Sequence, residues 1–159
     1  MSDLHDAQIM SLEIRLMRDD ELDDTVAVFH RSKRAALTFL PTEMEHTIED
    51  DRGYFSEVLM PKAQVWVALK DDRIVGLLAL AEQQVEQLYV DTEHQGTGVG
   101  AALLSHAKSQ SPAGLTLYTH QKNTRARRFY EKHGFVPIRF GISPAPESEP
   151  DVFFRWSPE

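Results

Sequence analysis

A glycine-rich turn in the second half of the chain contains the residue types that bind phosphate. Gly96, Gly98 and Gly100 follow a strand-like run at 85–90 and lead into a helix-like run. Closely spaced glycines let the backbone approach an anion, and the unpaired N–H groups of a helix's first turn then bind the phosphate oxygens. The sequence therefore predicts a ligand that carries phosphate.

The same turn satisfies the dinucleotide-binding pattern G-x-G-x-x-G/A, from Gly96 to Ala101. That pattern calls for an acidic residue about 20 positions further on, which holds the ribose. The corresponding segment, 116–121, contains no carboxylate. The turn also lies past the middle of the chain, whereas a dinucleotide turn usually follows the first strand. Both observations weigh against a nucleotide-dependent oxidoreductase, which stays as the weakest alternative.

A second motif downstream favours a different reading of the turn. Starting at Gln95, the turn reads Q/R-x-x-G-x-G/A, which resembles the acyl-CoA pyrophosphate loop of the GNAT superfamily of N-acetyltransferases. Segment 123–135 reads N-x-x-A-x-x-F-Y-x-x-x-G-F, which resembles that family's second signature at the usual distance. The resemblance extends in pattern from about Leu12 to Trp156. It implies the GNAT fold, with acetyl-CoA as the acetyl donor.

The resemblance also implies which residues hold acetyl-CoA. Main-chain groups of Leu88 and Val90 would bind the pantetheine arm as an added strand. Asn123 would contribute its side chain, although asparagine at that place also suits a helix N-cap. The residues expected to contact the cofactor are Leu88, Tyr89, Val90, Gln95, Gly96, Thr97, Gly98, Val99, Gly100, Ala101, Asn123 and Arg127.

Acetyl transfer to an amine requires a neutral amine, a stabilised oxyanion and a proton for the departing thiolate. The resemblance implies that Tyr130 is the general acid that supplies this proton, although its helical spacing also suits a core aromatic residue. The resemblance implies Glu86 as the base, since some members of the family use a carboxylate on this strand, and period-two alternation puts Glu86 on one strand face with Leu88 and Val90. His120, at the end of the next strand, is an alternative base, since imidazole changes charge near neutral pH. Water is another.

Composition excludes several classes of protein. The 159 residues include no cysteine, which excludes disulfides and acyl transfer through an enzyme thiolate. The net charge of −8 argues against nucleic-acid binding. Segment 101–141 nevertheless contains seven Lys or Arg residues and one acid, a local positive field that suits a polyanionic cofactor. The seven histidines show no metal-ligand spacing, so we expect no metal.

The length fits one domain. Residues 1–11 show no periodicity and are expected to form a loose N-terminal tail, so that 12–159 form a single N-acetyltransferase domain. No apolar run is long enough to span a membrane, and the first residues lack the features of a signal peptide. We therefore expect a cytoplasmic protein that binds no membrane. A homodimer is compatible with this interpretation.

Hydrophobic patterning predicts a mixed α/β fold with the order β-α-α-β-β-β-α-β-α-β-β. The expected strands lie at 12–16, 65–69, 74–80, 85–90, 115–119, 135–140 and 152–156. The expected helices run from acidic residues at 19–21 to a break at 39–41, then over about 49–61, 98–109 and 123–134. A polar hairpin turn at 70–73 and an irregular loop at 143–150 complete the pattern.

The acceptor amine leaves no readable motif. In the family that the chain resembles, the acceptor pocket is built largely from the first two helices and the loops near the C-terminus, which correspond to 29–60 and 141–151. Both a small molecule and a peptide N-terminus remain open as the acceptor. A catalytically silent acyl-CoA-binding module is the main alternative to an enzyme.

Overall fold

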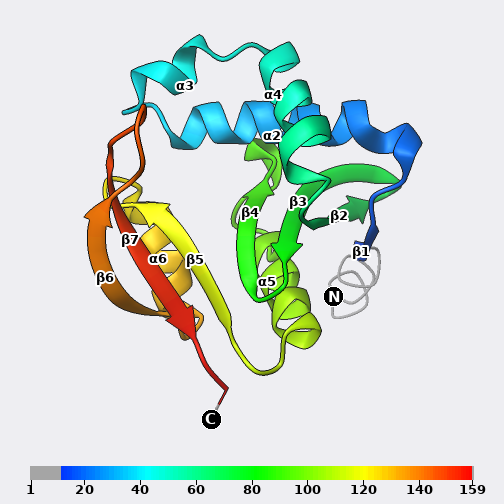
Figure 1. Ribbon diagram of the computed structural model, residues 1–159. Coiled ribbons are helices and arrows are strands. Elements are labelled where there is room, and N and C mark those ends of the chain that lie inside the picture. Colours follow the sequence, from blue (N-terminus) through cyan, green and yellow to red (C-terminus); the bar gives the residue numbers. More distant parts are fainter. Residues whose placement is uncertain (1–11, 159) are drawn as a thin grey trace.

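The computed structural model describes residues 12–158 as a mixed seven-stranded sheet with helices on both faces (Figure 1). The strands lie in the order β1-β2-β3-β4-β5-β7-β6, and β4 and β5 are the parallel pair. The strands are β1 (Leu12–Leu16), β2 (Gln64–Lys70), β3 (Arg73–Ala81), β4 (Gln84–Val90), β5 (Leu115–His120), β6 (Val136–Ile142) and β7 (Pro150–Trp156). The helices are η1 (Asp19–Glu21), α2 (Leu22–Ala36), α3 (Pro41–Glu45), α4 (Ile48–Tyr54), the π-helical η2 (Phe55–Leu59), η3 (Thr92–His94), α5 (Val99–Gln110) and α6 (Thr124–Lys132).

The predicted mixed α/β fold and element order are confirmed, with one addition. The predicted helix break at 39–41 is present, but Pro41 then starts the short helix α3, because its fixed φ suits the first position of a helix. The next helix begins with a capping box. Thr47 Oγ1 accepts from the N–H of Asp50 at 3.1 Å, and a carboxylate oxygen of Asp50 accepts from the N–H of Thr47 at 2.9 Å.

Two apolar cores hold the helices against opposite faces of the sheet. On one face, Leu103 of α5 and Tyr130 of α6 pack with Phe154 of β7. On the other, Phe29 of α2 and Phe55 of η2 pack against strands β2 to β4. Burial of each such side chain contributes about 1.5–3 kcal/mol. The helices that surround the centre of the sheet are therefore firmly anchored.

Strands β4 and β5 separate after a short contact. They pair at Gln84 with Thr116 and at Val85 with Leu117, and no further pair is formed between them. Beyond this contact, β4 continues to Val90 and β5 to His120. The two strands diverge beyond this contact in Figure 1.

Strand β4 contains one extra residue. Its pairing with β3 steps from Ala79↔Gln87 to Leu80↔Val85, so Glu86 has no partner and forms a bulge. A bulge shifts the alternation of side chains on the strand that carries it. The predicted strand face of Glu86 is consequently wrong, as its contacts show below.

Within the described residues, no helix is long and apolar enough to span a bilayer. The loose segment predicted at 1–11 lies outside the described residues.

Candidate functional site

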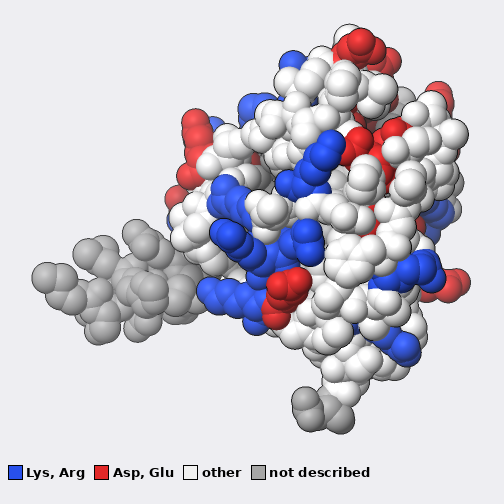
Figure 2. All heavy atoms as spheres, turned by 90° about the vertical axis from the view of Figure 1, so that its left-hand side faces the viewer, with Lys and Arg blue, Asp and Glu red and all other residues white. Residues whose placement is uncertain are grey.

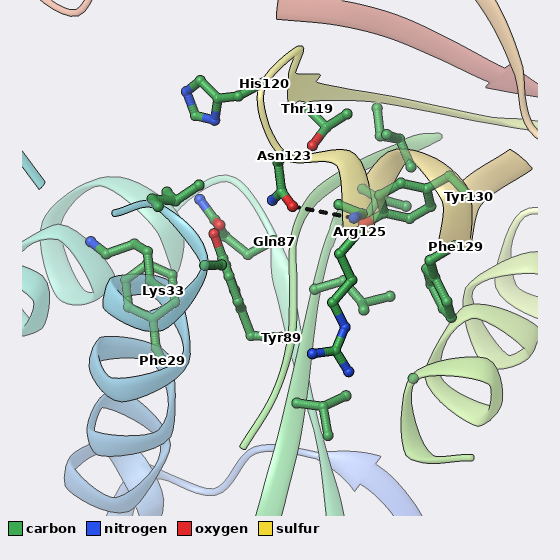
Figure 3. A pocket seen from close by; sticks show the side chains of 18 of the residues that line it. Phe29, Lys33, Gln87, Tyr89, Thr119, His120, Asn123, Arg125, Phe129 and Tyr130 are labelled. Carbon is green, nitrogen blue, oxygen red and sulfur yellow. Dashed lines mark hydrogen bonds between the residues drawn. The ribbon is translucent and has the colours of Figure 1, made fainter. Parts of the chain in front are cut away.

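A cavity of about 1010 Å³ opens where β4 and β5 diverge. Its walls come from α2, α3 and α4 on one side and from α5, α6 and the end of β5 on the other (Figure 3). Most of the residues that the sequence indicated are brought together here. Those that line the cavity are Glu86, Leu88, Tyr89, Val90, Gln95, Gly96, Gly98, Gly100, Ala101, Asn123 and Tyr130, together with the alternative base His120.

Three of the expected cofactor residues do not line the cavity. Thr97 donates its hydroxyl to the carbonyl of His94, and Val99 is buried in the core at 3% exposure. Arg127 donates to the carbonyl of Gln121 at 3.1 Å and lies over the ring of Phe140. The expectation that the Arg127 side chain faces the cofactor is therefore not met.

The main chain of β4 faces the opening at alternate residues. The N–H of Asp91 donates to the carbonyl of Val75 on β3 at 2.8 Å, so the preceding main-chain groups of Val90, and those of Leu88, point away from β3. The carbonyl of Val90 accepts a hydrogen bond from Nε2 of Gln95 at 3.2 Å. The strand thus offers unpaired main-chain groups along its open edge, and Gln95 satisfies one of them.

The glycine-rich turn has open space where side chains would otherwise stand. Gly96 and Gly98 have φ angles of +76° and +91°, in the left-handed region that favours glycine. A Cβ atom at either position would meet no protein atom within 4 Å. Gly98 is the N-cap of α5, whose first-turn N–H groups lie directly behind the turn. The residues present fit a phosphate group.

Basic side chains also line the cavity that contains the glycine-rich turn. Arg125 and Lys132 of α6 line it, and Arg125 points down along the opening in Figure 3. Figure 2 shows lysine and arginine side chains gathered on one part of the surface and acidic side chains set back in a hollow nearby. The predicted local positive field therefore reaches the cavity through Arg125 and Lys132. The arginine of α6 that lines the cavity is Arg125 rather than the expected Arg127.

Asn123 is placed so that the two functions left as alternatives by the sequence are compatible. Its Oδ1 accepts from the N–H of Ala126 at 3.2 Å, which caps α6 (Figure 3). Because the cap uses the oxygen, the two donors of the amide nitrogen stay free for another partner in the cavity. An N-cap role and a ligand-binding role are therefore compatible at this residue.

Tyr130 is both a core residue and part of the cavity wall. Its ring packs against Phe129, Phe135 and Phe154, and the whole residue is 8% exposed. Burial raises the pKa of its hydroxyl above the usual value, because the phenolate would be poorly solvated. The hydroxyl therefore stays protonated at neutral pH and can act as a proton donor.

An ion-pair network closes the opposite end of the cavity, and sequence reasoning missed it. Lys33 Nζ lies 2.6 Å from Asp51 Oδ1 and also contacts Glu43. The other oxygen of Asp51 lies 2.6 Å from Nδ1 of His30, and Glu43 lies 3.2 Å from Nδ1 of His46. The network connects α2, α3 and α4. The spacing of His30 and Lys33 indicates a shared helix face, but nothing local identifies the partners from later helices.

A metal ion has little room in this network. Among the described residues, Glu43, His46 and Asp51 are the group whose ligand atoms lie close enough to hold one. The ammonium group of Lys33 already contacts both carboxylates. A metal ion would have to displace it.

Glu86 faces the α2 and α4 side of the sheet rather than sharing a face with Leu88 and Val90. Its Oε2 lies 3.6 Å from Nζ of Lys62, which follows η2. Leu88 and Val90 instead pack toward the core formed by α5 and α6. The reason is the bulge, because the extra residue breaks the period-two alternation on which the expectation depended. Glu86 still lines the cavity.

Comparisons with known proteins agree with this geometry. The sequence model of the protein family described as acetyltransferase (GNAT) domain matches residues 61–137. The peptidyl-lysine N-acetyltransferase YjaB of Escherichia coli is 36% identical over 127 residues, which are 79% of this chain and 83% of that protein. The solution structure of apo-form YjaB from Escherichia coli matches with a TM-score of 0.77 and 29% identity, and the match covers 91% of this chain and 97% of that one.

A second relative was solved with its cofactor. A Bacillus anthracis protein assigned as a streptothricin acetyltransferase, in complex with acetyl coenzyme A, matches with a TM-score of 0.58 and 25% identity. The match covers 67% of this chain and 68% of that one. The family model, the sequence relative and the shared fold lead to one conclusion: the chain belongs to the GNAT superfamily of N-acetyltransferases.

Proposed function

We propose that this enzyme transfers an acetyl group from acetyl-CoA to a primary amine by direct attack in a ternary complex. The observation that carries the proposal is the single cavity at the divergence of β4 and β5. It connects a phosphate-binding turn at one end with a carboxylate-rich wall at the other. An amine and a thioester can therefore meet within it without a covalent enzyme intermediate, which the absence of cysteine also favours.

Acetyl-CoA supplies the acetyl group, and this chain supplies the groups that orient it. The main-chain N–H groups of 96–101 bind the pyrophosphate, and Arg125 adds positive charge. The open edge of β4 at Leu88 and Val90 and the free amide donors of Asn123 bind the pantetheine arm. Gln95 releases the carbonyl of Val90 when the arm binds there. The acetyl coenzyme A bound in the Bacillus anthracis relative supports acetyl-CoA as the donor.

Tyr130 acts as the general acid. Its protonated hydroxyl, held in a buried aromatic cluster, donates a proton to the departing CoA thiolate. Two side chains in the cavity are candidates for the base, Glu86 and His120. Each lies on a strand that borders the opening, Glu86 on β4 and His120 on β5.

The acceptor is a cationic primary amine. Carboxylates line the acceptor end of the cavity from two helices and one strand, and they attract a protonated amine electrostatically. These carboxylates belong to Glu43, Asp50, Asp51 and Glu86. Because the Escherichia coli relative is named a peptidyl-lysine N-acetyltransferase, lysine side chains of polypeptides join small amines and peptide N-termini as candidate acceptors.

The test is a screen for CoA release over primary amines, amino acids, aminoglycosides and short lysine-containing peptides. We expect saturable, acceptor-dependent release of the CoA thiol together with mass-spectrometric detection of the acetylated amine. Tight CoA binding without release for any acceptor would instead identify a silent acyl-CoA-binding module. Saturable quenching of NADH fluorescence would revive the oxidoreductase alternative.

A further inference from the structure

His120, at the end of β5, is held in place by two residues from distant parts of the chain. Its Nε2 lies 2.8 Å from Oε1 of Glu147, in the loop between β6 and β7. The ring of Phe39 contacts it edge to face, with centroids 5.5 Å apart. The imidazole is 19% exposed and lines the cavity. The ring is therefore oriented at the edge of the space in which the substrates meet.

The loop that carries Glu147 is itself well bonded. Ser143 Oγ donates to the same Oε1 of Glu147 at 2.8 Å. Ser143 also accepts from the N–H of Glu149 at 3.0 Å, and its own N–H donates to the Glu149 carbonyl at 2.8 Å. These bonds close the loop on itself. The carboxylate that contacts His120 thus has a fixed position.

The contact determines which ring nitrogen of His120 carries the proton. An ionised carboxylate only accepts hydrogen bonds, so Nε2 of the neutral ring holds the hydrogen and Nδ1 holds the lone pair. In Figure 3 the ring nitrogen next to the Cβ attachment, Nδ1, is turned toward Asn123 and the interior of the cavity. The lone pair is available to a group inside.

We propose that Nδ1 of His120 is the base that takes the proton of the acceptor amine, and that Glu147 is a positioning residue that fixes the tautomer required. This inference rests on the proposed acetyl transfer and deepens it. It gives the loop between β6 and β7 a role in positioning the base. Glu147 in this loop lies more than 20 residues after Asn123, the first residue of the second signature.

Glu86 is the weaker candidate for this task. Its carboxylate is engaged by Lys62 at 3.6 Å. Imidazole is the side chain best suited to accept and release a proton near neutral pH. Glu86 instead contributes negative charge that attracts the ammonium form of the acceptor.

Other charged groups near His120 are directed elsewhere. Lys122 pairs with Glu149 at 2.9 Å and lies over the ring of Phe39 at 6.0 Å. Asp151 is the cross-strand partner of His120 on β7, and its carboxylate lies near Gly141. Among the described residues, Glu147 is the ion-pair partner of the ring.

With His120 as the base and Tyr130 as the acid, every proton and bond of the reaction is accounted for. The ammonium group of the acceptor gives one proton to Nδ1 of His120, which passes it to solvent. The neutral nitrogen bonds to the acetyl carbon, the carbon–sulfur bond breaks, and the thiolate takes the proton of Tyr130. The proton shed by the new amide nitrogen then restores the Tyr130 hydroxyl. The products are the N-acetylated amine, CoA thiol and one proton.

Steady-state kinetics of four variants test the proposal, with acetyl-CoA and the best acceptor from the screen. His120→Gln should lower kcat by about 100-fold or more, the usual range for loss of a general base. Glu147→Ala should lower kcat by about tenfold or more with unchanged KM for acetyl-CoA. Glu147→Gln should recover most of the rate, because its amide oxygen accepts the same hydrogen bond. Glu149→Gln, which removes the same charge from the same loop, should act as wild type.

A wild-type rate in His120→Gln or in Glu147→Ala would overturn the proposal, as would a Glu147→Gln variant no faster than Glu147→Ala. A second readout needs no active variant. Nitrogen-15 NMR of the His120 side chain in the wild-type protein, at a pH where the ring is neutral, should show the Nε2–H tautomer. The Nδ1–H tautomer would contradict the proposal. If the wild-type protein releases no CoA with any acceptor, the proposed function is wrong. If the wild-type protein is active and His120→Gln is equally active, only the role of His120 is wrong.

Discussion

Tyr130 shows how one side chain can serve both packing and chemistry. Its spacing along α6 predicts a core aromatic residue, and the ring is indeed packed among Phe129, Phe135 and Phe154. The same position puts it in the wall of the cavity. The aromatic cluster fixes the ring, and the low polarity around it keeps the hydroxyl protonated.

Tyr130→Phe should lower kcat by about 100-fold or more, because the thiolate would leave without a proton donor. The affinity for acetyl-CoA should change less than about twofold, since the ring is held by its aromatic neighbours and not by a hydrogen bond from the hydroxyl to any of the described residues. Titration calorimetry with CoA and steady-state rates check both parts. An unchanged kcat in a folded variant would show that Tyr130 is not the general acid.

Two arginines two positions apart on α6 should behave differently. Residues two positions apart on a helix point in directions that differ by about 200°, so Arg125 and Arg127 face nearly opposite sides. Arg125 lines the cavity, whereas Arg127 is engaged with Gln121 and Phe140. The sequence motif alone does not tell which of the two arginines faces the cavity, because that depends on how α6 packs against the sheet.

Arg125→Gln should weaken CoA binding by about three- to tenfold, the loss of one exposed charge contact, and the effect should shrink as salt increases. Arg127→Gln is the matched control and should leave CoA affinity unchanged. Isothermal titration at two salt concentrations measures both. Equal losses in the two variants would contradict the placement of Arg125 at the cofactor.

At the scale of elements, the strand–turn–helix unit around 85–110 could be predicted well, because glycine spacing and apolar periodicity are local signals. The bulge at Glu86 could not, since it depends on the register of β3 against β4. The network of Lys33, Glu43 and Asp51 also escaped prediction. Its members come from three helices whose approach is set by tertiary packing.

The turn supports a direct prediction about the cofactor. Gly98→Val places a β-branched side chain at φ +91°, in the open space that we assign to the pyrophosphate. CoA affinity should fall at least about tenfold, with a stability loss of about 1–2 kcal/mol from the strained backbone. Gly53→Ala is the control, because Gly53 lies inside α4 and a Cβ atom there would enter open space. This variant should keep its CoA affinity, and its free energy of unfolding should rise by up to about 1 kcal/mol because alanine favours a helix more than glycine does. Undiminished affinity in folded Gly98→Val would refute the phosphate assignment.

The buried network should matter for stability as well as for the acceptor. Asp51→Ala removes the carboxylate shared by Lys33 and His30, and the loss of one partner of a buried pair costs about 3 kcal/mol. Chemical denaturation should show this loss, together with a higher KM for the amine. Glu49→Ala, an exposed acid of the same helix, should change stability by less than about 0.5 kcal/mol. A small effect in Asp51→Ala would mean that the network neither holds the helices nor shapes the acceptor end.

At the scale of the whole molecule, element types and order were predictable, whereas their arrangement in space was less so. The patterning predicted seven strands, but it gave no sign that β7 inserts between β5 and β6. That insertion brings the loop between β6 and β7 to the end of β5, where Glu147 meets His120. The donor end of the site lies within one continuous stretch of sequence and was largely foreseen. The acceptor end is assembled from 29–60 and 141–151, the segments that the resemblance indicated, but the contacts of Lys33 and Glu147 within it were not foreseen.

In the proposed reaction, an amine attacks acetyl-CoA directly within one cavity. The decisive experiment measures initial rates of CoA thiol release while the concentrations of acetyl-CoA and a primary amine are both varied. We expect acceptor-dependent release and intersecting double-reciprocal lines, the pattern of a ternary complex. Parallel lines, with a burst of CoA in the absence of acceptor, or no release for any amine, would contradict it.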